Sequence, residues 1–406
     1  MTTNGKDTSV VIVGGGVAGL ALGNFLLRKG VGCVVLEKHS REHVEQRQRA
    51  GSLDAGGVRR LREWGLAEVV EGHGHSDSGG TVPLLIEGEE RRWKVGVADG
   101  GDGDDGAYCP QQVLVRNLIK VFLRDGGDLR FGAEDVSLHD VDTGNPLVRY
   151  RRDDGTTRTL SCDFVAGGDG FHGVSRTAVP TDVLTSSTHA FGYAWLAAMT
   201  AAPVDPPAVM AVHSRGFAAQ ITRGPNASRL YLQCPLTDTV GQWPDDRIWS
   251  ELGARFGAYA PCKGPITSKQ IVPLQGVVFS PMSHGRLYLL GDAAHIISPM
   301  SAQGMSLALH DADVFARAVI HWVEEHDSAL LDRYSRTCLD HTWRKQASAV
   351  WMTEAMHDAG DPSYEGEFRK RIALKNLESL LEPLEPLEPL EPLEPLEPLE
   401  ADNPAA

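Results

Sequence analysis

The sequence predicts an α/β (α+β) protein with a layer of parallel strands and helices, a second domain built on a β-sheet, and a helical C-terminal region. Three observations predict this fold class. A short apolar run, a glycine-rich turn and a helical pattern follow one another near the N-terminus. Residues 190–235 read mostly as strands with short turns, and a long amphipathic pattern follows residue 300. With 406 residues, 42% of them hydrophobic, the chain is long enough for two or three domains.

The first elements form a β-α-β unit. Residues 9–13 are an apolar, β-branched run, which is typical of a buried parallel strand. A helix is expected over 17–29, with a glycine at its end, and a second strand over 33–36. This order predicts a Rossmann-like domain.

A glycine fingerprint lies between the first strand and the helix. Gly14 makes the turn, Gly16 lets the backbone approach a phosphate, and Gly19 lets helix and strand pack closely. Glu37, at the end of the second strand, would accept a hydrogen bond from a ribose hydroxyl. The unit therefore predicts dinucleotide binding, although by itself it does not separate NAD from FAD.

The middle of the chain contains a loop rich in glycine and aspartate and several predicted strands. Residues 96–106 form a Gly/Asp loop, which lacks the closing glutamate and flanking helices of a calcium site. Strands are expected over 147–152 and 158–165, around a turn at 153–155. Another buried strand is expected over 286–290.

The C-terminal part reads as helix and then as low complexity. The amphipathic helix after residue 300 is marked by apolar residues three to four apart, and further helix is expected over 328–357 and 366–380. Six Leu-Glu-Pro triplets run from Leu381 to Pro398. Proline at every third position favours an extended polyproline-II rod. A partner-binding segment and a solvated extension both remain open for this tail.

Charge and composition exclude several classes of protein. The net charge is −15, and the tail from Leu381 carries seven glutamates and one aspartate without lysine or arginine. Residues 1–380 therefore carry a net charge of −7. The sequence has no stripe rich in lysine and arginine, so a nucleic-acid partner is not expected. No apolar run is long enough for a transmembrane helix, so none is expected. The polar N-terminal residues lack the pattern of a secretory signal. Six cysteines without a C-x-x-C pair argue against a zinc or disulfide scaffold and favour the cytoplasm.

Two further motifs decide between the dinucleotides. One is the strand 162–168 ending in Asp169-Gly170, and the other is Gly291-Asp292, read as a strand-to-helix turn where Asp292 can bind a ribitol and the helix N-terminus can face a flavin. Together with the fingerprint, in this order, they resemble the flavin-dependent aromatic hydroxylases (class A FAD monooxygenases) over roughly residues 8–380.

The resemblance implies the domain layout and the cofactors. It implies a discontinuous FAD-binding domain at 1–180 and 275–325, a β-sheet substrate domain at 181–274, a C-terminal helical region at 326–380, and the tail at 381–406. It further implies FAD, NADH or NADPH as a transient electron donor, O₂ as cosubstrate, hydroxylation of a small aromatic (benzoate-type) acid through a flavin C4a-hydroperoxide, and a homodimer.

Residue roles follow from the same resemblance, position by position. The ADP half of FAD is assigned to the fingerprint glycines and the acidic residue after them, and the pyrophosphate, ribitol or ring side to Arg49, Gln111 and Asp292. Arg229 matches an arginine linked to flavin movement, and His172 and Arg176 lie in the nicotinamide-nucleotide region. Arg223 and Tyr231 match residues that bind the substrate carboxylate, and Pro299 matches a proline whose carbonyl faces a ring substituent.

Departures from the family pattern bear on the substrate. Met210 stands where the family has a tyrosine that deprotonates the substrate phenol, and Ile221 stands where it has a carboxylate-binding serine. The tail replaces the stretch with a second relay tyrosine, and His73–Asp77 gives no clear match for the relay histidine.

These losses predict a ring that needs no phenol ionisation, because an amino group supplies electron density. The candidate is 3-amino-4-hydroxybenzoate, with hydroxylation at C2. The mixed charges of residues 38–43 favour NADH over NADPH. The alternatives are 3-hydroxylation of 4-hydroxybenzoate, a flavoprotein reductase of the same fold that inserts no oxygen, and a non-enzymatic interaction protein that uses the tail.

Overall fold

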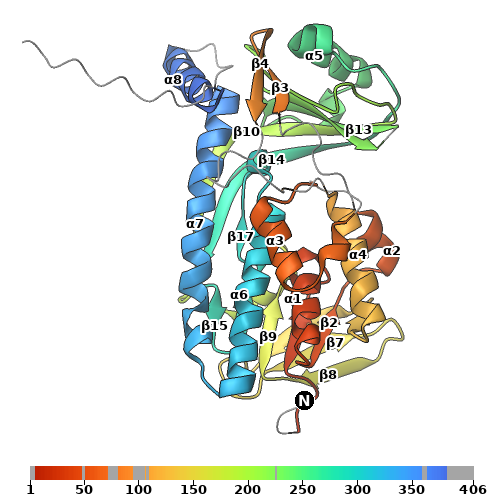
Figure 1. Ribbon diagram of the computed structural model, residues 1–406, viewed down its shortest axis with the longest axis vertical. Helices are drawn as coiled ribbons and strands as arrows, with labels where there is room; N and C mark the ends of the chain where they lie inside the picture. The colour runs from red at the N-terminus through yellow and green to blue at the C-terminus, as the bar shows by residue number, and fades with distance from the viewer. Residues whose placement is uncertain are drawn as a thin grey trace, which may run out of the picture.

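The computed structural model describes residues 5–47, 51–71, 81–94, 106, 109–224, 226–358 and 364–381. Two sheet-based parts are stacked along the long axis of the molecule, with the N-terminus at one end (Figure 1). Helix α7 (Ala329–His357) runs along the side of both parts, and the long strands β10 and β14 lead from one to the other (Figure 1). The predicted α/β class is confirmed.

A six-stranded sheet forms the Rossmann-like part. Every residue of β1, β2 and β9 is buried, which explains their continuous apolar sequences, and β1 pairs in parallel with both neighbours. Helix α1 (Val17–Arg28) packs against both α4 (Gln111–Arg124) and α6 (Gly304–Glu325). The strands, in sheet order, are β15 (Ser283–His284), β16 (Leu287–Leu289), β9 (Phe164–Gly167), β1 (Val10–Val13), β2 (Cys33–Leu36) and β5 (Asp128–Arg130).

The single strand expected over 158–165 is wrong, because two strands in different sheets share this segment. β8 (Thr157–Ser161) completes a three-stranded antiparallel sheet with β6 (Glu134–His139) and β7 (Leu147–Arg151). The chain then turns at Asp163, whose backbone N–H donates to Ser9 O over 3.0 Å, and enters β9. The polar, exposed start of β8 and the wholly buried β9 require different neighbours.

An eight-stranded sheet forms the second part. It takes in β3 and β4 from residues 81–94, which the predicted boundaries assign to the first domain, because β3 pairs in parallel with β11. Pairing across more than a hundred residues leaves no trace in a local pattern. The strands, in sheet order, are β17 (His295–Ile296), β14 (Ile266–Ser280), β10 (Thr185–Thr200), β13 (Ala227–Pro235), β12 (Ala218–Gly224), β11 (Ala208–Val212), β3 (Thr81–Ile86) and β4 (Glu89–Lys94).

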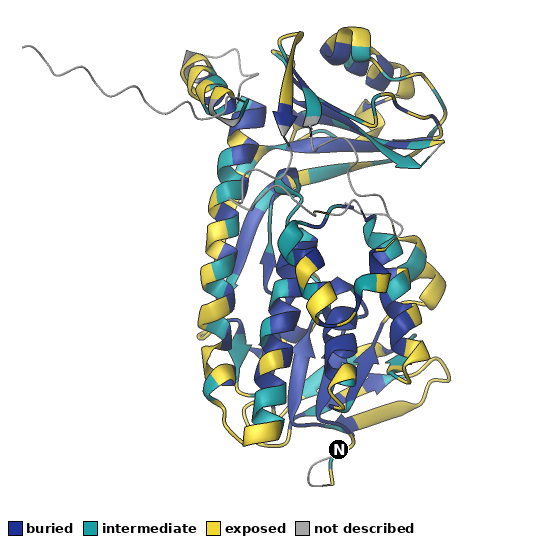
Figure 2. Ribbon diagram, viewed as in Figure 1, coloured by how far each residue is buried: buried dark blue, intermediate teal, exposed yellow. Residues whose placement is uncertain are grey.

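The two faces of this sheet are covered differently. Leu230 and Leu232 of β13 point to a core shared with Ile248 and Leu252 of α5 (Asp245–Phe256). Alternate residues of the same strand point to the opposite face, where a second core includes residues of α7 and α8 (Tyr364–Leu381). Figure 2 shows many buried residues in the strands and exposed residues along helices such as α7. The second face is the one that turns toward the Rossmann-like part.

The Gly-Asp motif does not lead straight into a helix, so that expectation is wrong. A 3-10 turn η6 (Gly291–Ala293), the short strand β17 and a second 3-10 turn η7 (Pro299–Ser301) come before α6. Pro299 favours a chain break at this point, and its predecessor caps η7 by accepting from Met300 N. The N-terminus of α6 is therefore separated from the motif by the eleven residues 293–303.

The remaining elements agree with the expected helical regions. α7 and α8 correspond to the helices expected over 328–357 and 366–380. None of the helices in the described ranges is long and apolar enough to cross a bilayer. The loop at 96–105 and the tail from 382 lie outside the described residues. The short helices are α2 (Arg41–Gln46), α3 (Ala55–Glu63), η1 (Ala67–Val69), η3 (Ser175–Ala178), η4 (Val240–Gln242) and η5 (Gly257–Tyr259).

Candidate active site

The glycine fingerprint has the geometry of a phosphate cradle. A Cβ atom on Gly14, which has φ +106°, would lie 2.4 Å from Gly168 O, and one on Gly19 would lie 2.0 Å from Gly14 O. Both positions therefore require glycine for packing. A Cβ on Gly16, the N-cap of α1, would meet nothing within 4 Å. This open space beside the helix N-terminus fits the pyrophosphate of a dinucleotide.

Glu37 is held against the fingerprint turn. Its Oε2 accepts from Gly15 N over 2.7 Å, and its Oε1 accepts from His39 N over 2.8 Å. The side chain is only 8% exposed. Because a carboxylate has about four lone-pair positions, two backbone donors leave acceptor capacity for a ribose hydroxyl.

The Asp-Gly motif packs directly on the fingerprint, since Gly168 is the neighbour that forbids a side chain at Gly14. Asp169 accepts from Ser175 N over 2.9 Å, and burial raises the pKa of its carboxyl. Arg176, which the resemblance places in the nicotinamide-nucleotide region, donates to Ala293 O over 3.0 Å. That bond ties the loop after the Asp-Gly motif to the Gly-Asp turn.

The Gly-Asp turn is anchored from below by Asp311. This fully buried carboxylate accepts from Gly291 N over 2.9 Å and from His295 Nε2 over 2.8 Å. Burial acts to lower the pKa of His295, but the Asp311 carboxylate outweighs it and the pKa is raised. Asp292, half-buried, stands on this anchored turn. Asp311 is an acidic residue on the buried face of the amphipathic helix, which is the signal that could have revealed it.

The three motifs meet because parallel strands end together. β1, β9 and β16 are neighbours in one sheet, and each motif follows the carboxyl end of its strand. Such ends are where open α/β sheets bind their ligands. A Cβ on Gly291 would lie 3.3 Å from the Cβ of Ala18, so the Gly-Asp turn also rests on α1.

The predicted substrate residues share one face of the eight-stranded sheet. Met210 and Tyr231 each lie opposite Ala219, on the two strands that flank β12. Ile221 lies opposite Arg229 in the next row of that face. Arg223 follows two residues later in β12, at an irregularity in the pairing with β13 between Thr222 and Gly224. The structure thus brings together on this face four residues that are spread over more than twenty positions.

Arg223 reaches toward the Rossmann-like part. Its Nη1 would lie 3.3 Å from a Cβ on Gly51, and that Cβ would also lie 2.7 Å from the Cα of Pro110. Pro110 is the N-cap of α4, and Gln111 is the first residue of that helix. The predicted carboxylate-binding and flavin-binding residues therefore approach one another at this junction. Arg49 lies outside the described residues.

The other predicted residues lie around this junction. Pro299 opens η7, and its neighbour Met300 belongs to the core under the substrate-facing side of the sheet. Arg229 places its guanidinium carbon 5.7 Å from the ring centroid of Tyr231. His172 is exposed on the loop after the Asp-Gly motif, with its ring 5.0 Å from that of Phe171.

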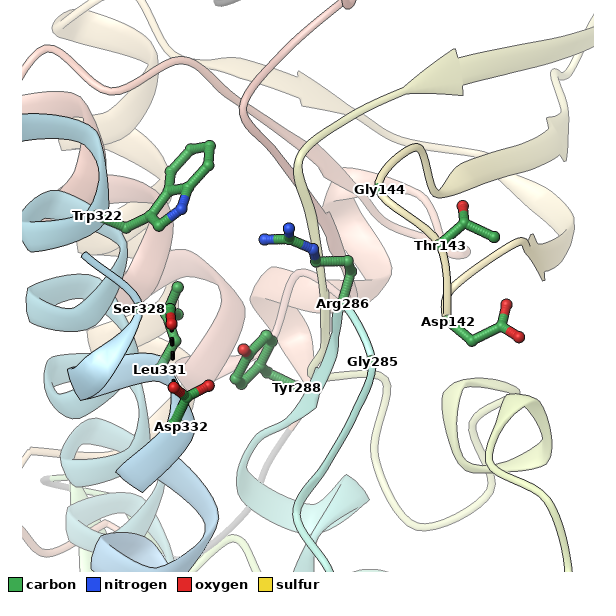
Figure 3. Close-up of a pocket in the computed structure, with 10 residues that line it drawn as sticks. All are labelled: Asp142, Thr143, Gly144, Gly285, Arg286, Tyr288, Trp322, Ser328, Leu331 and Asp332. Atoms are coloured by element: carbon green, nitrogen blue, oxygen red, sulfur yellow. Dashed lines mark hydrogen bonds between the residues drawn. The ribbon is translucent and has the colours of Figure 1, made fainter. Parts of the chain in front are cut away.

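Two adjoining hollows lie at the other end of the sheet. They have volumes of about 320 and 300 Å³ and share Arg286, which precedes β16, and Trp322. Figure 3 shows the residues that line the first of them. The guanidinium carbon of Arg286 lies 5.0 Å from the ring of Phe164. Because the motifs follow the carboxyl ends of the strands, a hollow at the amino end of β16 is separate from them.

Fold and site together define a two-part protein in which a dinucleotide-type glycine cradle and a sheet that carries the predicted substrate residues lie in neighbouring parts. The FAD binding domain family matches residues 7–349, and the chain belongs to this family. It is 33% identical over 378 residues to p-hydroxybenzoate hydroxylase of Acinetobacter baylyi, covering 92% of this chain and 91% of that protein. It is 23% identical to a probable NADH-specific resorcinol 4-hydroxylase of Rhodococcus jostii, covering 81% of this chain and 62% of that protein.

Solved structures show the same fold at lower identity. Aklavinone-11 hydroxylase, in complex with FAD and aklavinone, matches with a TM-score of 0.75 and 20% identity over 87% of this chain and 70% of its own. A p-nitrophenol 4-monooxygenase from Pseudomonas putida matches with a TM-score of 0.72 and 19% identity over 92% and 96%. The chain is an FAD-dependent flavoprotein monooxygenase of the aromatic hydroxylase type, with NAD(P)H and O₂ as its co-reactants.

Proposed function

We propose that the protein hydroxylates a benzoate that carries both an amino and a hydroxyl group, with 3-amino-4-hydroxybenzoate as the candidate and C2 as the position attacked. The reaction consumes the aromatic acid, NAD(P)H, a proton and O₂, and yields the hydroxylated acid, NAD(P)⁺ and water. Bound FAD supplies the redox chemistry. The chain's own residues bind the acid, orient its ring and keep water away.

The observation that carries the proposal is the chemistry of one row of side chains. Leu84, Met210, Ala219 and Tyr231 lie side by side across four neighbouring strands on the substrate face. Tyr231 is the one member of this row with a proton to exchange, and the resemblance assigns it to the carboxylate. A phenol placed beside Met210 meets thioether and methyl groups, so no member of the row there can accept its proton.

An amino substituent replaces the help that a phenolate would give. It donates electron density to the ring at positions ortho and para to itself, and C2 is ortho to an amino group at C3. Arg223, planar and bidentate, is suited to the carboxylate at the other end of the ring. In this arrangement the carboxylate of the substrate binds Arg223 and the substituted end of the ring lies beside Met210. The edge of the ring would then face Pro299 and the flavin.

The second candidate is 3-hydroxylation of 4-hydroxybenzoate. It is favoured by the 33% identity to p-hydroxybenzoate hydroxylase. It requires the phenol to be activated by a group other than Met210.

A panel of aromatic acids separates these candidates. We expect 3-amino-4-hydroxybenzoate to stimulate NAD(P)H oxidation and to give one product heavier by a single oxygen, derived from ¹⁸O₂. Efficient and coupled turnover of 4-hydroxybenzoate alone would overturn the proposal. NAD(P)H oxidation without incorporated ¹⁸O would indicate a reductase that inserts no oxygen.

Restoring a hydroxyl at Met210 tests the reasoning behind the substrate. Met210→Tyr is expected to raise kcat/KM for 4-hydroxybenzoate, relative to the amino compound, at least about ten-fold, since general-base assistance contributes about 10²-fold or more. Met210→Phe supplies the ring without the hydroxyl and is the control. An equal change in both variants would show that bulk, and not proton transfer, matters at this position.

We also propose that NADH is preferred to NADPH. After Glu37, Arg41 pairs with Glu45 over 2.7 Å within α2, and His39 stacks on His43 with ring centroids 4.3 Å apart. A cation already paired with a carboxylate is less suited to bind a 2′-phosphate. The ratio of kcat/KM for the two nucleotides measures the preference, and a strong preference for NADPH would contradict it.

A cytoplasmic homodimer is the accompanying proposal. All six cysteines are free thiols, and only Cys262 is exposed, which suits a reducing compartment. The dimer rests on the family resemblance, and light scattering during size-exclusion chromatography tests it. A monomer at micromolar concentration would contradict this proposal.

A further inference from the structure

A continuous chain of buried polar groups lies behind the proposed substrate site. Trp195 Nε1 donates to His357 Nε2 over 2.7 Å, and His357 Nδ1 lies 2.7 Å from Thr353 O. Thr353 Oγ1 lies 2.6 Å from Ala349 O and 2.7 Å from Ser298 Oγ. Trp195, Ser298, Thr353 and His357 are each 5% exposed or less.

Donor and acceptor chemistry determines which group carries each proton in this hydrogen-bond network. An indole N–H only donates, so His357 Nε2 accepts and Nδ1 carries the proton to Thr353 O. A carbonyl only accepts, so the single Thr353 hydroxyl proton goes to Ala349 O. Ser298 must then donate to Thr353 Oγ1, while its own oxygen accepts from Met300 N over 3.5 Å. The network therefore has one consistent arrangement that uses each group.

The network connects two walls of the site. Trp195 lies on β10, and its ring centroid is 4.8 Å from that of Tyr231 on the sheet wall. Ser298 directly precedes Pro299 and caps η7, the turn that the proposed function makes the second wall of the site. Thr353 and His357 are four residues apart on α7 and so share one face of that helix. One helical turn holds both walls.

The turn itself is in a conformation that needs support. Ala302, the C-cap of η7, has φ +53° in the left-handed region, which non-glycine residues adopt only where the surroundings impose it. Burial lowers the pKa of His357 to about 3. The imidazole therefore stays neutral at any pH at which the enzyme works, and the network keeps the same geometry.

We infer that Thr353 and His357 are positioning residues, which hold the Pro299 turn at a set distance from the sheet wall that carries Tyr231 and thereby orient the aromatic ring. The inference rests on the proposed function, because that function makes these two surfaces the walls of the substrate site. Neither residue is placed in contact with substrate or cofactor.

Thr353→Val tests the inference, because it keeps the shape of the side chain and removes the hydroxyl. We expect a KM for the aromatic acid raised about ten-fold, less hydroxylated product per NAD(P)H consumed, and a kcat for NAD(P)H oxidation within about two-fold of wild type. Thr353→Ser keeps the hydroxyl and should restore KM and coupling.

Thr342→Val is the matched control. Thr342 is fully buried on the same helix, and its hydroxyl makes no hydrogen bond within the described part of the chain. This variant should leave KM and coupling unchanged. A Thr353→Val enzyme with wild-type KM and coupling, whether or not its melting temperature falls, would overturn the inference.

A second variant tests the inference if Thr353→Val does not fold. Ser298→Ala interrupts the network at the turn and removes only one oxygen atom, and it should raise KM and lower coupling in the same way. Unchanged values in Ser298→Ala would likewise overturn the inference. A wild-type enzyme that neither binds nor hydroxylates any benzoate of the panel would overturn the proposed function first, and this inference with it.

Discussion

At the scale of single residues, the fingerprint glycines have separate physical tasks. Gly14 and Gly19 are needed because backbone oxygens occupy the space of a side chain, whereas Gly16 faces open space. The sequence motif treats the three alike. The structure therefore separates glycines required for packing from one beside open space, where we propose that the FAD pyrophosphate binds.

Alanine substitutions should separate these two tasks. Gly19→Ala is expected to lower the free energy of unfolding by about 3 kcal/mol, because its Cβ would overlap Gly14 O. Gly16→Ala should change stability by less than about 1 kcal/mol and still weaken FAD binding about ten-fold or more. Urea unfolding of the apoprotein and FAD titration measure the two effects, and a stable Gly19→Ala protein with full flavin content would contradict this assignment.

The buried pair under the Gly-Asp turn should make stability depend on pH. A pKa that is raised in the folded state, as for His295, adds stability that is fully present below the unfolded value of about 6.5 and is lost as the pH rises through the folded pKa. Asp311→Asn removes that contribution and should cost about 3 kcal/mol at pH 6.

The difference in unfolding free energy between wild type and Asp311→Asn is therefore expected to shrink as the pH increases from 6 to 9. Urea titrations at several pH values measure it. A difference that stays constant over this range would show that the pair does not carry a charge in the folded protein.

At the scale of elements, α5 is fastened to the outer face of the eight-stranded sheet by a buried cation. Arg255 is 4% exposed, donates to Phe217 O over 2.8 Å, and lies 3.3 Å from Glu251 one turn earlier on α5. Burial lowers the pKa of Arg255 to about 10. The carboxylate of Glu251, which also pairs with Arg215, compensates the buried charge.

Glu251→Gln should therefore destabilise the protein by about 2 kcal/mol, because Arg255 would be left without its counterion. The control is Glu63→Gln, which breaks an exposed ion pair with Arg317 and should cost less than about 0.5 kcal/mol. Urea midpoints followed by tryptophan fluorescence compare the two. Equal midpoints would mean that the α5 ion pair contributes no more than a surface pair.

At the scale of the whole molecule, charge is divided unevenly. About half of the net −15 belongs to the tail, while residues 1–380 carry −7. We therefore propose that anions are bound by individually placed cations such as Arg223 and by the α1 N-terminus, and not by bulk positive charge.

Removing residues 382–406 tests whether the tail takes part in the reaction. We expect kcat/KM for the aromatic acid and the melting temperature to stay within about two-fold and 2 °C of the full chain, because the cores described above end with α8. Elution from an anion exchanger should shift to lower salt. A loss of turnover on truncation would show that the tail supplies part of the site.

The parts of the candidate site that lie in short sequence motifs could be predicted from the sequence. The fingerprint, Glu37 and the Gly-Asp motif follow from short strings of residues at the ends of apolar strands. Asp311 and the Ser298–Thr353–His357 network were not predictable, because their roles depend on which distant groups they meet. The boundary of the second sheet was missed for the same reason, since β3 joins β11 across the chain.

The sequence by itself determined that this protein has a layer of parallel strands that binds a dinucleotide. It also determined that the protein is similar to the flavin-dependent hydroxylases. Those conclusions rest on periodicity and on glycine spacing, which are local properties. Only the tertiary structure decided that Met210, Ile221, Arg229 and Tyr231 share one face, and that α7 ties this face to the Pro299 turn. Strand register and buried hydrogen bonds join residues far apart in the chain, and no local pattern records which ones meet.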